Sequence, residues 1–409
     1  MSTPIPSPYR PNSAGGCPHA ANARLRATGN VIDILLAGDV PGKLVLGHDT
    51  VKELLSRPDI GKSPQHFTLL REGRIPEGWP LLVFAVTPGM LTADGDDHRR
   101  LRSLVSQAFT ARRVAELRPR IEEETTVLLD AMERVARDGG GVADLRTHFA
   151  LPLPLHVICA LLGVEREYAD RLHGLSGPLL STSVGPEEAV AAHQEMLSVL
   201  GTIAAARRER PGDDLTSALI AAREENGDRL SEAELIGTMM LLIIAGHETT
   251  LNLITNAVRA LLAHPDQLAA VRSGAASWAD VVEETLRWDA PVSYFPFRYP
   301  VEDLVLDGTP IARGTPVLAA YSAAGRDPAA YGLDADRFVV TRRSRHLSLG
   351  HGAHFCLGAP LARMEAAVAL EALFDRFPEL EPAVAEAELP RRPTFVGNSV
   401  LELPLRLLP

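Results

Sequence analysis

The chain has few cysteines, few aromatic residues and no excess of positive charge. Its three cysteines lie at unrelated spacings among 409 residues, which excludes a disulfide framework and is typical of a reducing cytosol. The net charge of −11 argues against nucleic acid as the main partner. Aromatic residues make up only 5% of the chain, so its 46% of hydrophobic residues is mostly aliphatic. This composition predicts a globular protein with a substantial core.

Long hydrophobic runs are also absent. The most apolar interior stretches are residues 149–164, which carry two prolines and a histidine, and residues 238–246, which are too short to cross a bilayer. No basic segment followed by an apolar one begins the chain, so a signal peptide is not expected. We therefore expect a cytoplasmic protein without a membrane anchor. Residues 1–20, with five prolines, suggest a flexible N-terminal arm before a single domain over residues 21–409.

Helical periodicity dominates the rest of the chain, and strand-like segments are short. The pattern predicts helices over residues 48–57, 95–107, 111–137, 152–162, 187–209, 213–225, 231–263, 277–288 and 359–377. Strands are predicted within residues 31–46, 292–320 and 394–408. Residues 60–94 are apolar but have no clear element, which favours a binding lid. The fold class is therefore mainly α with a small β-rich region.

The most informative segment is residues 347–358, where Cys356 stands between glycines just ahead of a predicted helix. Unpaired N–H groups at a helix N-terminus favour a thiolate, and glycines let a flat group approach closely. A lone thiolate of this kind suits the axial ligand of a haem iron. Two alternatives remain, namely a zinc site that also uses His346, His351 and His354, and a cysteine that is merely buried.

This segment resembles the haem-ligand loop of the cytochrome P-450 superfamily, the haem-thiolate monooxygenases. Gly352, His354, Cys356 and Gly358 match the family pattern, and Leu349 stands where the family usually has Phe. The resemblance implies haem b as the cofactor, Cys356 as the iron ligand, and a fold that holds the haem between a long central helix and the Cys loop. It covers the chain from about residue 30 to the C-terminus.

The long helix predicted over residues 231–263 starts with a Ser-x-x-Glu capping box, and its middle contains Ala245, Gly246, Glu248 and Thr249. Thr249 is able to donate a hydrogen bond back to the Ala245 carbonyl and open the helix for water. Taken alone, the segment also fits a solvent-facing Glu beside an ordinary Thr. The family has the same motif above the oxygen-binding side of the haem. The resemblance implies that Thr249 stabilises bound dioxygen and Glu248 relays protons.

Two further sets of residues follow the family pattern. Glu284 and Arg287, three apart on one predicted helix, correspond to a buried ion pair with a structural role. His98, Arg102, Arg298 and His354 correspond to the partners of the haem propionates. Each motif also has a simpler interpretation, as a surface salt bridge or an exposed basic helix.

The resemblance implies a soluble bacterial-type monooxygenase that inserts one atom of O₂ into a hydrophobic substrate of moderate size. Polyketides or macrolactones, then steroids or terpenoids, are the preferred substrates. The chain has no flavin or nicotinamide motif, so electrons are expected from a separate ferredoxin and ferredoxin reductase. Arginine clusters at 99–102, 112–113 and 342–345 suggest the docking face. The expected pocket residues are Leu241, Leu242, Ala245, Val292, Tyr294, Phe295, Phe395 and Val396.

Alternatives within and outside this class stay open. They are an oxidative aryl-coupling enzyme of the same family, a haem-binding protein without turnover, and a zinc-stabilised protein without haem. The expected roles are those of a monomer in biosynthetic tailoring, that is, secondary metabolism.

Overall fold

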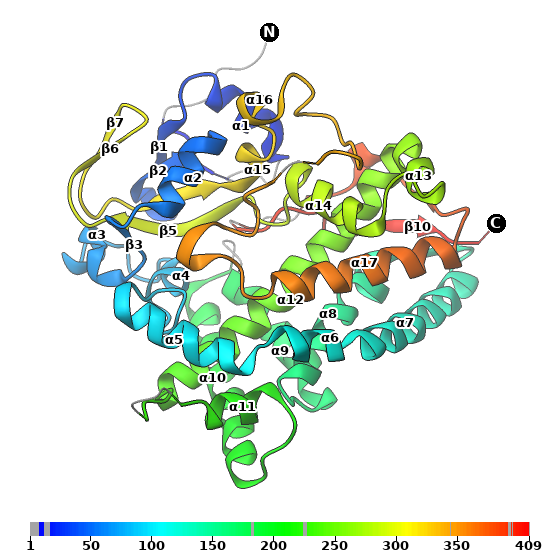
Figure 1. The fold of residues 1–409 in the computed structure, drawn as a ribbon, viewed down its shortest axis with the longest axis horizontal. Helices are drawn as coiled ribbons and strands as arrows, with labels where there is room; N and C mark the ends of the chain where they lie inside the picture. The colour runs from blue at the N-terminus through cyan, green and yellow to red at the C-terminus, as the bar shows by residue number, and fades with distance from the viewer. Residues whose placement is uncertain are drawn as a thin grey trace.

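The fold is mainly helical, with the main sheet at the upper left of Figure 1 and strand β10 (Pro404–Arg406) of a smaller sheet at the opposite side. The computed structural model describes residues 8–11, 17–180, 184–223, 227–343, 345–391, 394 and 396–408. The helices of the large helical region are α5 (Gly95–Ala108), α6 (Ala111–Glu116), α7 (Arg118–Asp138), α8 (Pro152–Leu161), α9 (Arg166–Leu180), α10 (Pro186–Glu209), α11 (Leu215–Ala221), α12 (Glu232–Ala263), α13 (Pro265–Arg272), α14 (Trp278–Trp288) and α17 (Ala359–Arg376). The mainly α fold with small sheets is confirmed.

The main sheet has five strands in the order β1-β2-β8-β5-β3. Their bounds are β1 (Val31–Leu35), β2 (Pro41–Val45), β3 (Ile60–Gly61), β5 (Tyr294–Pro300) and β8 (Val317–Ala320). Strands β2 and β8 run parallel, and the other pairs are antiparallel. Two smaller sheets join β4 (Val142–Asp144), β10 (Pro404–Arg406) and β9 (Glu381–Pro382), and β6 (Leu304–Leu306) with β7 (Thr309–Ile311). Sequence-distant strands thus meet in each of the two larger sheets.

The long helix α12 crosses the centre of the molecule (Figure 1). The predicted capping box is present, because Ser231 Oγ accepts from the Glu234 N–H and Glu234 accepts from the Ser231 N–H at 2.7 Å. The helix has 32 residues and hence a length of about 48 Å. Its apolar side chains pack in the main core cluster together with α8, α14 and α17. It therefore provides a buried, rigid support for the residues along its middle.

The N-terminal residues that the structure describes are packed onto the domain rather than held loosely. Residues 18–20 begin helix α1 (Pro18–Arg26), which lies beside the short helix α15 (Tyr321–Ala324). Asn22 donates to Ser322 Oγ at 2.9 Å, across 300 residues of sequence. His19 and Asp289 are 2.7 Å apart. The flexible-arm prediction is therefore wrong for residues 17–20, since polar partners from far along the chain hold them.

Residues 60–94 also differ from the sequence prediction. They contain β3, α3 (Thr68–Arg71) and α4 (Leu82–Val86), together with a short 3-10 turn at Pro64–His66. Phe67 and Trp79 are buried against Phe297 and Tyr299 of β5. These aromatic side chains belong to the core beneath the sheet, because large apolar rings gain more from full burial than from lining a lid.

Short helices complete the fold, and one predicted helix is divided. The remaining helices are α2 (His48–Ser56) and α16 (Pro328–Tyr331), with a π-helical turn at Arg146–Ala150 and 3-10 turns at Ala37–Asp39, Gly352–His354 and Glu386–Glu388. The predicted helix over 111–137 forms α6 and α7, which meet at Leu117 just before Pro119. Proline lacks the N–H that a continuous helix needs and is tolerated in the first turn of a new one.

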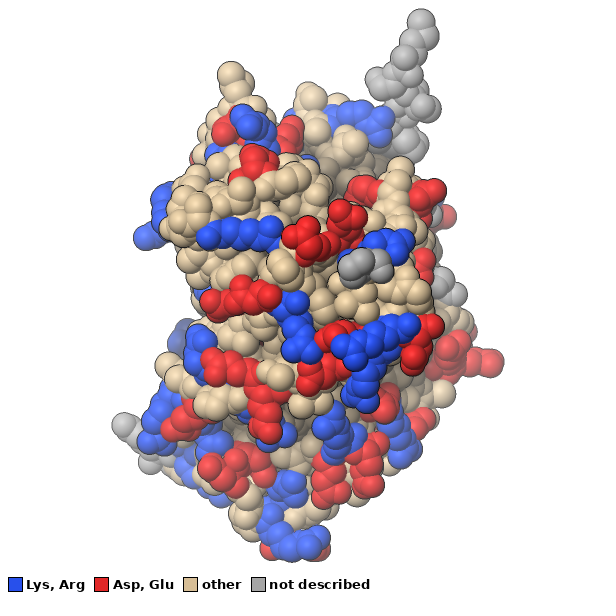
Figure 2. Space-filling model, turned by 90° about the vertical axis from the view of Figure 1, so that its right-hand side faces the viewer, with Lys and Arg blue, Asp and Glu red and all other residues tan. Residues whose placement is uncertain are grey.

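Among the described residues, no single helix is both long enough and apolar enough to span a bilayer, and one pair bent by 118°, residues 146–161 with 166–179, meets the length and composition test together. On the face in Figure 2, basic and acidic side chains are interspersed and form no large patch of one sign.

Candidate active site

The Cys loop is held by two glycines that adopt conformations unfavourable to other residues. Gly350 has φ of +79° and Gly352 has φ of +70°. A Cβ at Gly352 would lie 2.9 Å from the Leu55 carbonyl oxygen, so the loop packs closely on α2. The Cys356 N–H then donates to the Leu349 carbonyl at 2.8 Å, and α17 begins three residues later at Ala359. The loop therefore presents Cys356 ahead of a helix N-terminus, as predicted.

The electrostatic surroundings of Cys356 only partly favour its anion. Burial raises the pKa of the Cys356 thiol, while the Gly358 N–H and the Arg102 guanidinium lower it without fully offsetting the burial. The N–H groups at the helix N-terminus thus favour the thiolate, as expected, but burial of the thiol outweighs them. A bound metal cation deprotonates a coordinating thiol outright. The site suits a metal ligand better than a free nucleophile.

A cavity of about 230 Å³, measured as the space open to the centres of water molecules, lies between the Cys loop and the middle of α12. Cys356 of the Cys loop and Thr249 of α12 both line it. Five of the predicted pocket residues also line it: Leu241, Leu242, Ala245, Val292 and Phe295. Most of the lining is apolar, which favours a flat hydrophobic cofactor together with a hydrophobic ligand.

The other three predicted pocket residues are not among the described residues that line the cavity. Tyr294 is fully buried on the opposite side of β5 from Phe295, and its hydroxyl donates to Asn22 at 2.9 Å. Successive strand residues point to opposite faces, so Phe295 and Tyr294 cannot both line the cavity. Val396 is not among the lining residues and packs against the core clusters near the sheet. Phe395 lies outside the described residues.

The oxygen-side motif on α12 has the predicted local geometry. Thr249 Oγ1 donates to the Ala245 carbonyl at 2.7 Å, and both residues line the cavity. Glu248 is buried and does not line the cavity. Its carboxylate lies 3.7 Å from His247 Nε2. The Thr249 hydroxyl therefore lies on the cavity wall, whereas the Glu248 carboxylate lies beside His247.

Cationic and hydrogen-bonding groups gather at one end of the cavity, as the sequence predicts for propionate partners. His98, Arg102, Arg298 and His354 all line it, and the His98 and His354 rings are 4.1 Å apart. The Nε2 atom of His98 is buried without a hydrogen-bond partner. Arg298 is buried, and none of the described residues forms a hydrogen bond or ion pair with its guanidinium. Unpaired buried donors of this kind require an anion, and the two carboxylates of haem fit them.

Lys62 extends this positive region, and sequence reasoning did not identify it. The side chain is buried, and its ammonium lies 3.3 Å from the carbonyls of Pro296 and Phe297. Burial, and secondarily Arg298, lowers the pKa of Lys62 well below its usual value. Burial, followed by Lys62 and its neighbours, lowers the pKa of His354 to about 2. No signal in the sequence marked Lys62, because a lone lysine before a turn is usually exposed.

A buried carboxyl was missed for a similar reason. Glu365 of α17 lines the cavity and is only 2% exposed. Burial raises the pKa of Glu365 well above its usual value and so favours the protonated carboxyl. In the sequence of α17 nothing distinguishes this residue from an ordinary surface glutamate.

The Glu284–Arg287 pair has the predicted structural role. Both side chains are buried, and Arg287 donates to the Glu284 carboxylate at 2.6 and 2.7 Å. Arg287 also donates to the carbonyls of Gly325, Ala335 and Arg337, each at 2.7 Å. The pair thereby fixes α14 to the segment that leads into the Cys loop.

The zinc alternative at the Cys loop is not supported by the arrangement of its histidines. His346 is 3.2 Å from Glu283, on the side of α14, whereas His354 faces His98. Within the part of the chain that the structure describes, only one group of three metal-ligating side chains converges, and it lies on α9 and α12.

The basic clusters predicted to form a docking face are largely paired with acids. Arg99 pairs with Asp96, and Arg100 with Glu234. The other ion pairs are Arg112 with Glu116, Arg113 with Asp213, Arg342 with Asp334 and Arg343 with Asp280. Their net positive potential is therefore smaller than the sequence clusters suggest.

Comparison with known proteins agrees with this site. The sequence model of the family described as Cytochrome P450 matches residues 187–274 and 279–405, more than half of the chain. The chain belongs to the cytochrome P450 family. It is 39% identical over 402 residues to 2-hydroxy-5-methyl-1-naphthoate 7-hydroxylase of Streptomyces carzinostaticus, which covers 98% of this chain and 97% of that one.

Two further relatives span nearly the whole chain. The 6-deoxyerythronolide B hydroxylase of Saccharopolyspora erythraea is 39% identical over 394 residues, covering 94% of this chain and 95% of its own. The solved structure of CYP154A1 from Streptomyces coelicolor A3(2) has a TM-score of 0.90 and 43% identity, covering 98% of this chain and 100% of that one. This cytochrome P450 is therefore a haem b monooxygenase that uses O₂, redox partners and a small-molecule substrate.

Proposed function

We propose that this cytochrome P450 hydroxylates a hydrophobic, ring-containing small molecule of the polyketide or macrolactone class. The observation that carries the proposal is the apolar cavity lined by Cys356 on one side and Thr249 on the other. Two of the relatives are named as hydroxylases of a naphthoate and of a macrolactone. Both names denote ring compounds, and the mostly apolar cavity suits the hydrocarbon part of such a ring.

Each site residue has a distinct part in the proposed reaction. Haem bound in the cavity supplies oxygen activation and one-electron redox chemistry. Cys356 is its ligand, and His98, Arg102, Arg298 and His354 hold its carboxylates. The Thr249 hydroxyl donates a hydrogen bond at the oxygen side, and Glu248 supplies protons to that side. Leu241, Leu242 and Phe295 exclude water and orient the substrate.

A second cavity bears on the size of the substrate. Its volume, measured in the same way, is about 70 Å³, and Leu91 and Leu241 line both cavities. Residues 83–91, the end of the predicted lid, form much of its wall. The two cavities together favour a substrate larger than a single aromatic ring, with one end near Thr249 and the other beneath α4.

A separate ferredoxin and its reductase are the proposed electron donors. Arg102 donates to the Phe355 carbonyl at 2.8 Å, so α5 lies directly against the Cys loop, and the face there is the shortest route to the ligand. Arg99 and Arg343 are exposed on elements around this loop. Replacing each with glutamine should slow reduction by a ferredoxin and weaken the salt dependence of that reduction.

The test begins with the absorption spectrum of reduced protein under carbon monoxide, which should show the Soret band of a thiolate-ligated haem. Cys356→Ser should lose that band, whereas Cys17→Ser, at an exposed cysteine, should keep it. Ferric protein is then titrated with macrolactones, aromatic polyketides, steroids and fatty acids, and the low-to-high-spin shift is recorded. Turnover with labelled O₂ should place one labelled atom in a polyketide substrate. A spin shift and product with fatty acids alone would overturn the proposed substrate class.

A further inference from the structure

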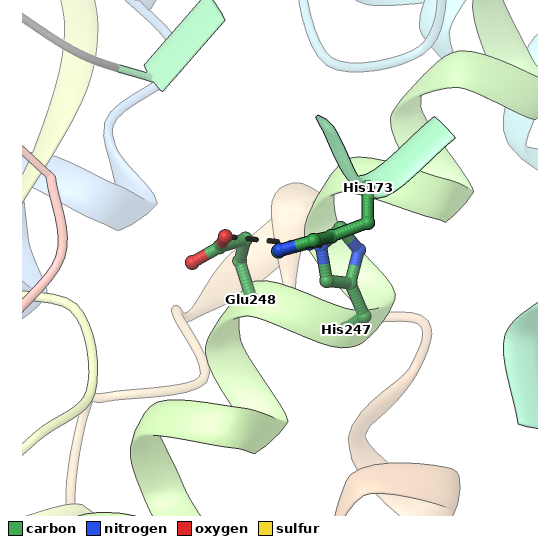
Figure 3. Close-up of side chains that lie close together, drawn as sticks. All are labelled: His173, His247 and Glu248. Atoms are coloured by element: carbon green, nitrogen blue, oxygen red, sulfur yellow. Dashed lines mark hydrogen bonds and ion pairs between the residues drawn. The ribbon is translucent and has the colours of Figure 1, made fainter. Parts of the chain in front are cut away.

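Three metal-ligating side chains meet where α9 passes over α12. His173 comes from α9, and His247 and Glu248 are neighbours on α12 (Figure 3). His173 Nδ1 is 3.2 Å from His247 Nε2, which is 3.7 Å from Glu248 Oε1. One donor atom from each residue lies within 4.8 Å of the other two. These side chains lie close together in Figure 3, and none of them lines the cavity between the Cys loop and α12.

The hydrogen bond on the far side of the His247 ring determines which nitrogen is available. His247 Nδ1 is 2.7 Å from the Ile243 carbonyl, an acceptor, so this nitrogen carries the proton. In the neutral ring, Nε2 then has its lone pair directed at the cluster. A histidine whose other nitrogen donates to a backbone carbonyl is the usual arrangement of a metal ligand, because that bond orients the ring and increases its basicity.

The distances match those of a small transition-metal ion. Zinc binds histidine nitrogen and carboxylate oxygen at about 2.0–2.1 Å, so two ligand atoms of a tetrahedral site lie about 3.4 Å apart. The separations of 3.2 and 3.7 Å fall on either side of that value. We propose that His173, His247 and Glu248 form a binding site for a divalent transition-metal ion, with zinc as the best match, and with water as the fourth ligand.

Burial and position give the site a consequence for the enzyme. His247 and Glu248 are buried, whereas His173 is half-buried and provides the approach from solvent. A bound ion would tie α9 to α12 and occupy the carboxylate next to Thr249. Zinc should therefore slow turnover by withholding protons from the oxygen side. This effect rests on the proposed role of Glu248, whereas the binding of the ion does not.

The experiment uses the haem-loaded enzyme without a histidine tag. Equilibrium dialysis against zinc, followed by metal analysis, should find one tightly bound ion per chain. His173→Ala and His173→Gln should each weaken that binding at least tenfold, with an unchanged carbon monoxide spectrum as the check on folding. His156→Ala is the matched control. His156 also lies beside a carboxylate, 2.6 Å from Glu124, but it does not belong to the group of three metal-ligating side chains found among the described residues. It should leave the stoichiometry at one.

The rate of product formation with and without zinc provides a second, independent measurement. Zinc at saturating concentration should slow product formation severalfold in the wild type and in His156→Ala, relative to the zinc-free rate of each protein. The same addition should have little effect on His173→Ala. Equal zinc binding by the wild type and both His173 variants would overturn the site. Tight binding without any effect on product formation would keep the site and contradict the role given to Glu248.

Discussion

Arg287 holds Glu284 through two parallel hydrogen bonds, at 2.6 and 2.7 Å, in the interior of the protein. The Arg287 guanidinium also donates three hydrogen bonds to backbone carbonyls. A shorter or neutral side chain would not make all of these bonds. The arrangement ties α14 to the segment before the Cys loop, so the stability of the haem site depends on it.

Removing this arginine should destabilise the protein severely. Breaking a buried ion pair by deleting one partner costs about 3–5 kcal/mol, because the remaining charge is left buried. Arg287→Ala should therefore lower the free energy of unfolding by that amount and reduce the haem content of purified protein. Chemical denaturation and the ratio of Soret to protein absorbance measure the two effects. Arg118→Ala, at an exposed pair with Glu122, should cost less than about 1 kcal/mol. Similar losses for both variants would contradict the argument.

The Thr249 hydroxyl should couple oxygen consumption to product. Its donation to the Ala245 carbonyl places it on the cavity wall, so Thr249→Ala removes a proton donor without altering the apolar lining. We expect the substrate-induced spin shift to persist while hydrogen peroxide replaces most of the product, with product per NADH reduced about tenfold or more. Thr238→Val on the same helix removes a buried hydroxyl that has no partner, and it should leave the product ratio unchanged. An unchanged ratio in Thr249→Ala would remove its assigned role.

Arg298 should lower the stability of the haem-free protein and strengthen the binding of haem. In the absence of an anion its charge is buried and unpaired among the described residues, and burial lowers its pKa. Arg298→Leu should therefore stabilise the haem-free protein and at the same time weaken haem retention about tenfold. Thermal unfolding of the haem-free protein and haem transfer to apomyoglobin measure the two opposite effects. A variant that destabilises the haem-free protein would indicate a structural role instead.

Glu365 should make stability depend on pH in a direction opposite to that of an ion-paired acid. Because burial raises the pKa of this carboxyl, the folded state keeps a proton that the unfolded state loses. The contribution of Glu365 to the free energy of unfolding is therefore most favourable below the unfolded-state pKa of about 4.3, and it falls as pH rises above that value. Glu365→Gln should remove this loss and raise the melting temperature at pH 7–8 more than at pH 5. An equal shift at both pH values would show that the carboxyl is not the cause.

Much of the site could be predicted because its parts are local in sequence. The capping box of α12, the Thr249 bond to Ala245 and the turn at Gly352 each depend on residues within a few positions of one another. Their chemistry therefore does not require knowledge of the tertiary fold. The propionate partners needed the family resemblance as well, because His98 and Arg298 lie 200 residues apart.

Other features depend on tertiary contacts that no local pattern reveals. Helix α9 was missed because Gly174, Gly177 and Pro178 lower its helical propensity, and packing on α10 and α12 compensates for this. The approach of His173 to His247 joins residues 74 apart. The direction of Tyr294 depended on the register of β5, since a shift of one residue reverses the face on which every side chain lies.

The hydrogen bonds that join α1 to residues 322–326 have a consequence for biosynthesis. Asn22 and Arg26 find their partners only after about 300 further residues have been added. At a synthesis rate of about 5–20 residues per second, this helix waits about 15–60 s on the ribosome before its binding surface exists. Helix α1 thus docks long after it has been made, and the nascent protein must keep it free of competing contacts throughout that interval.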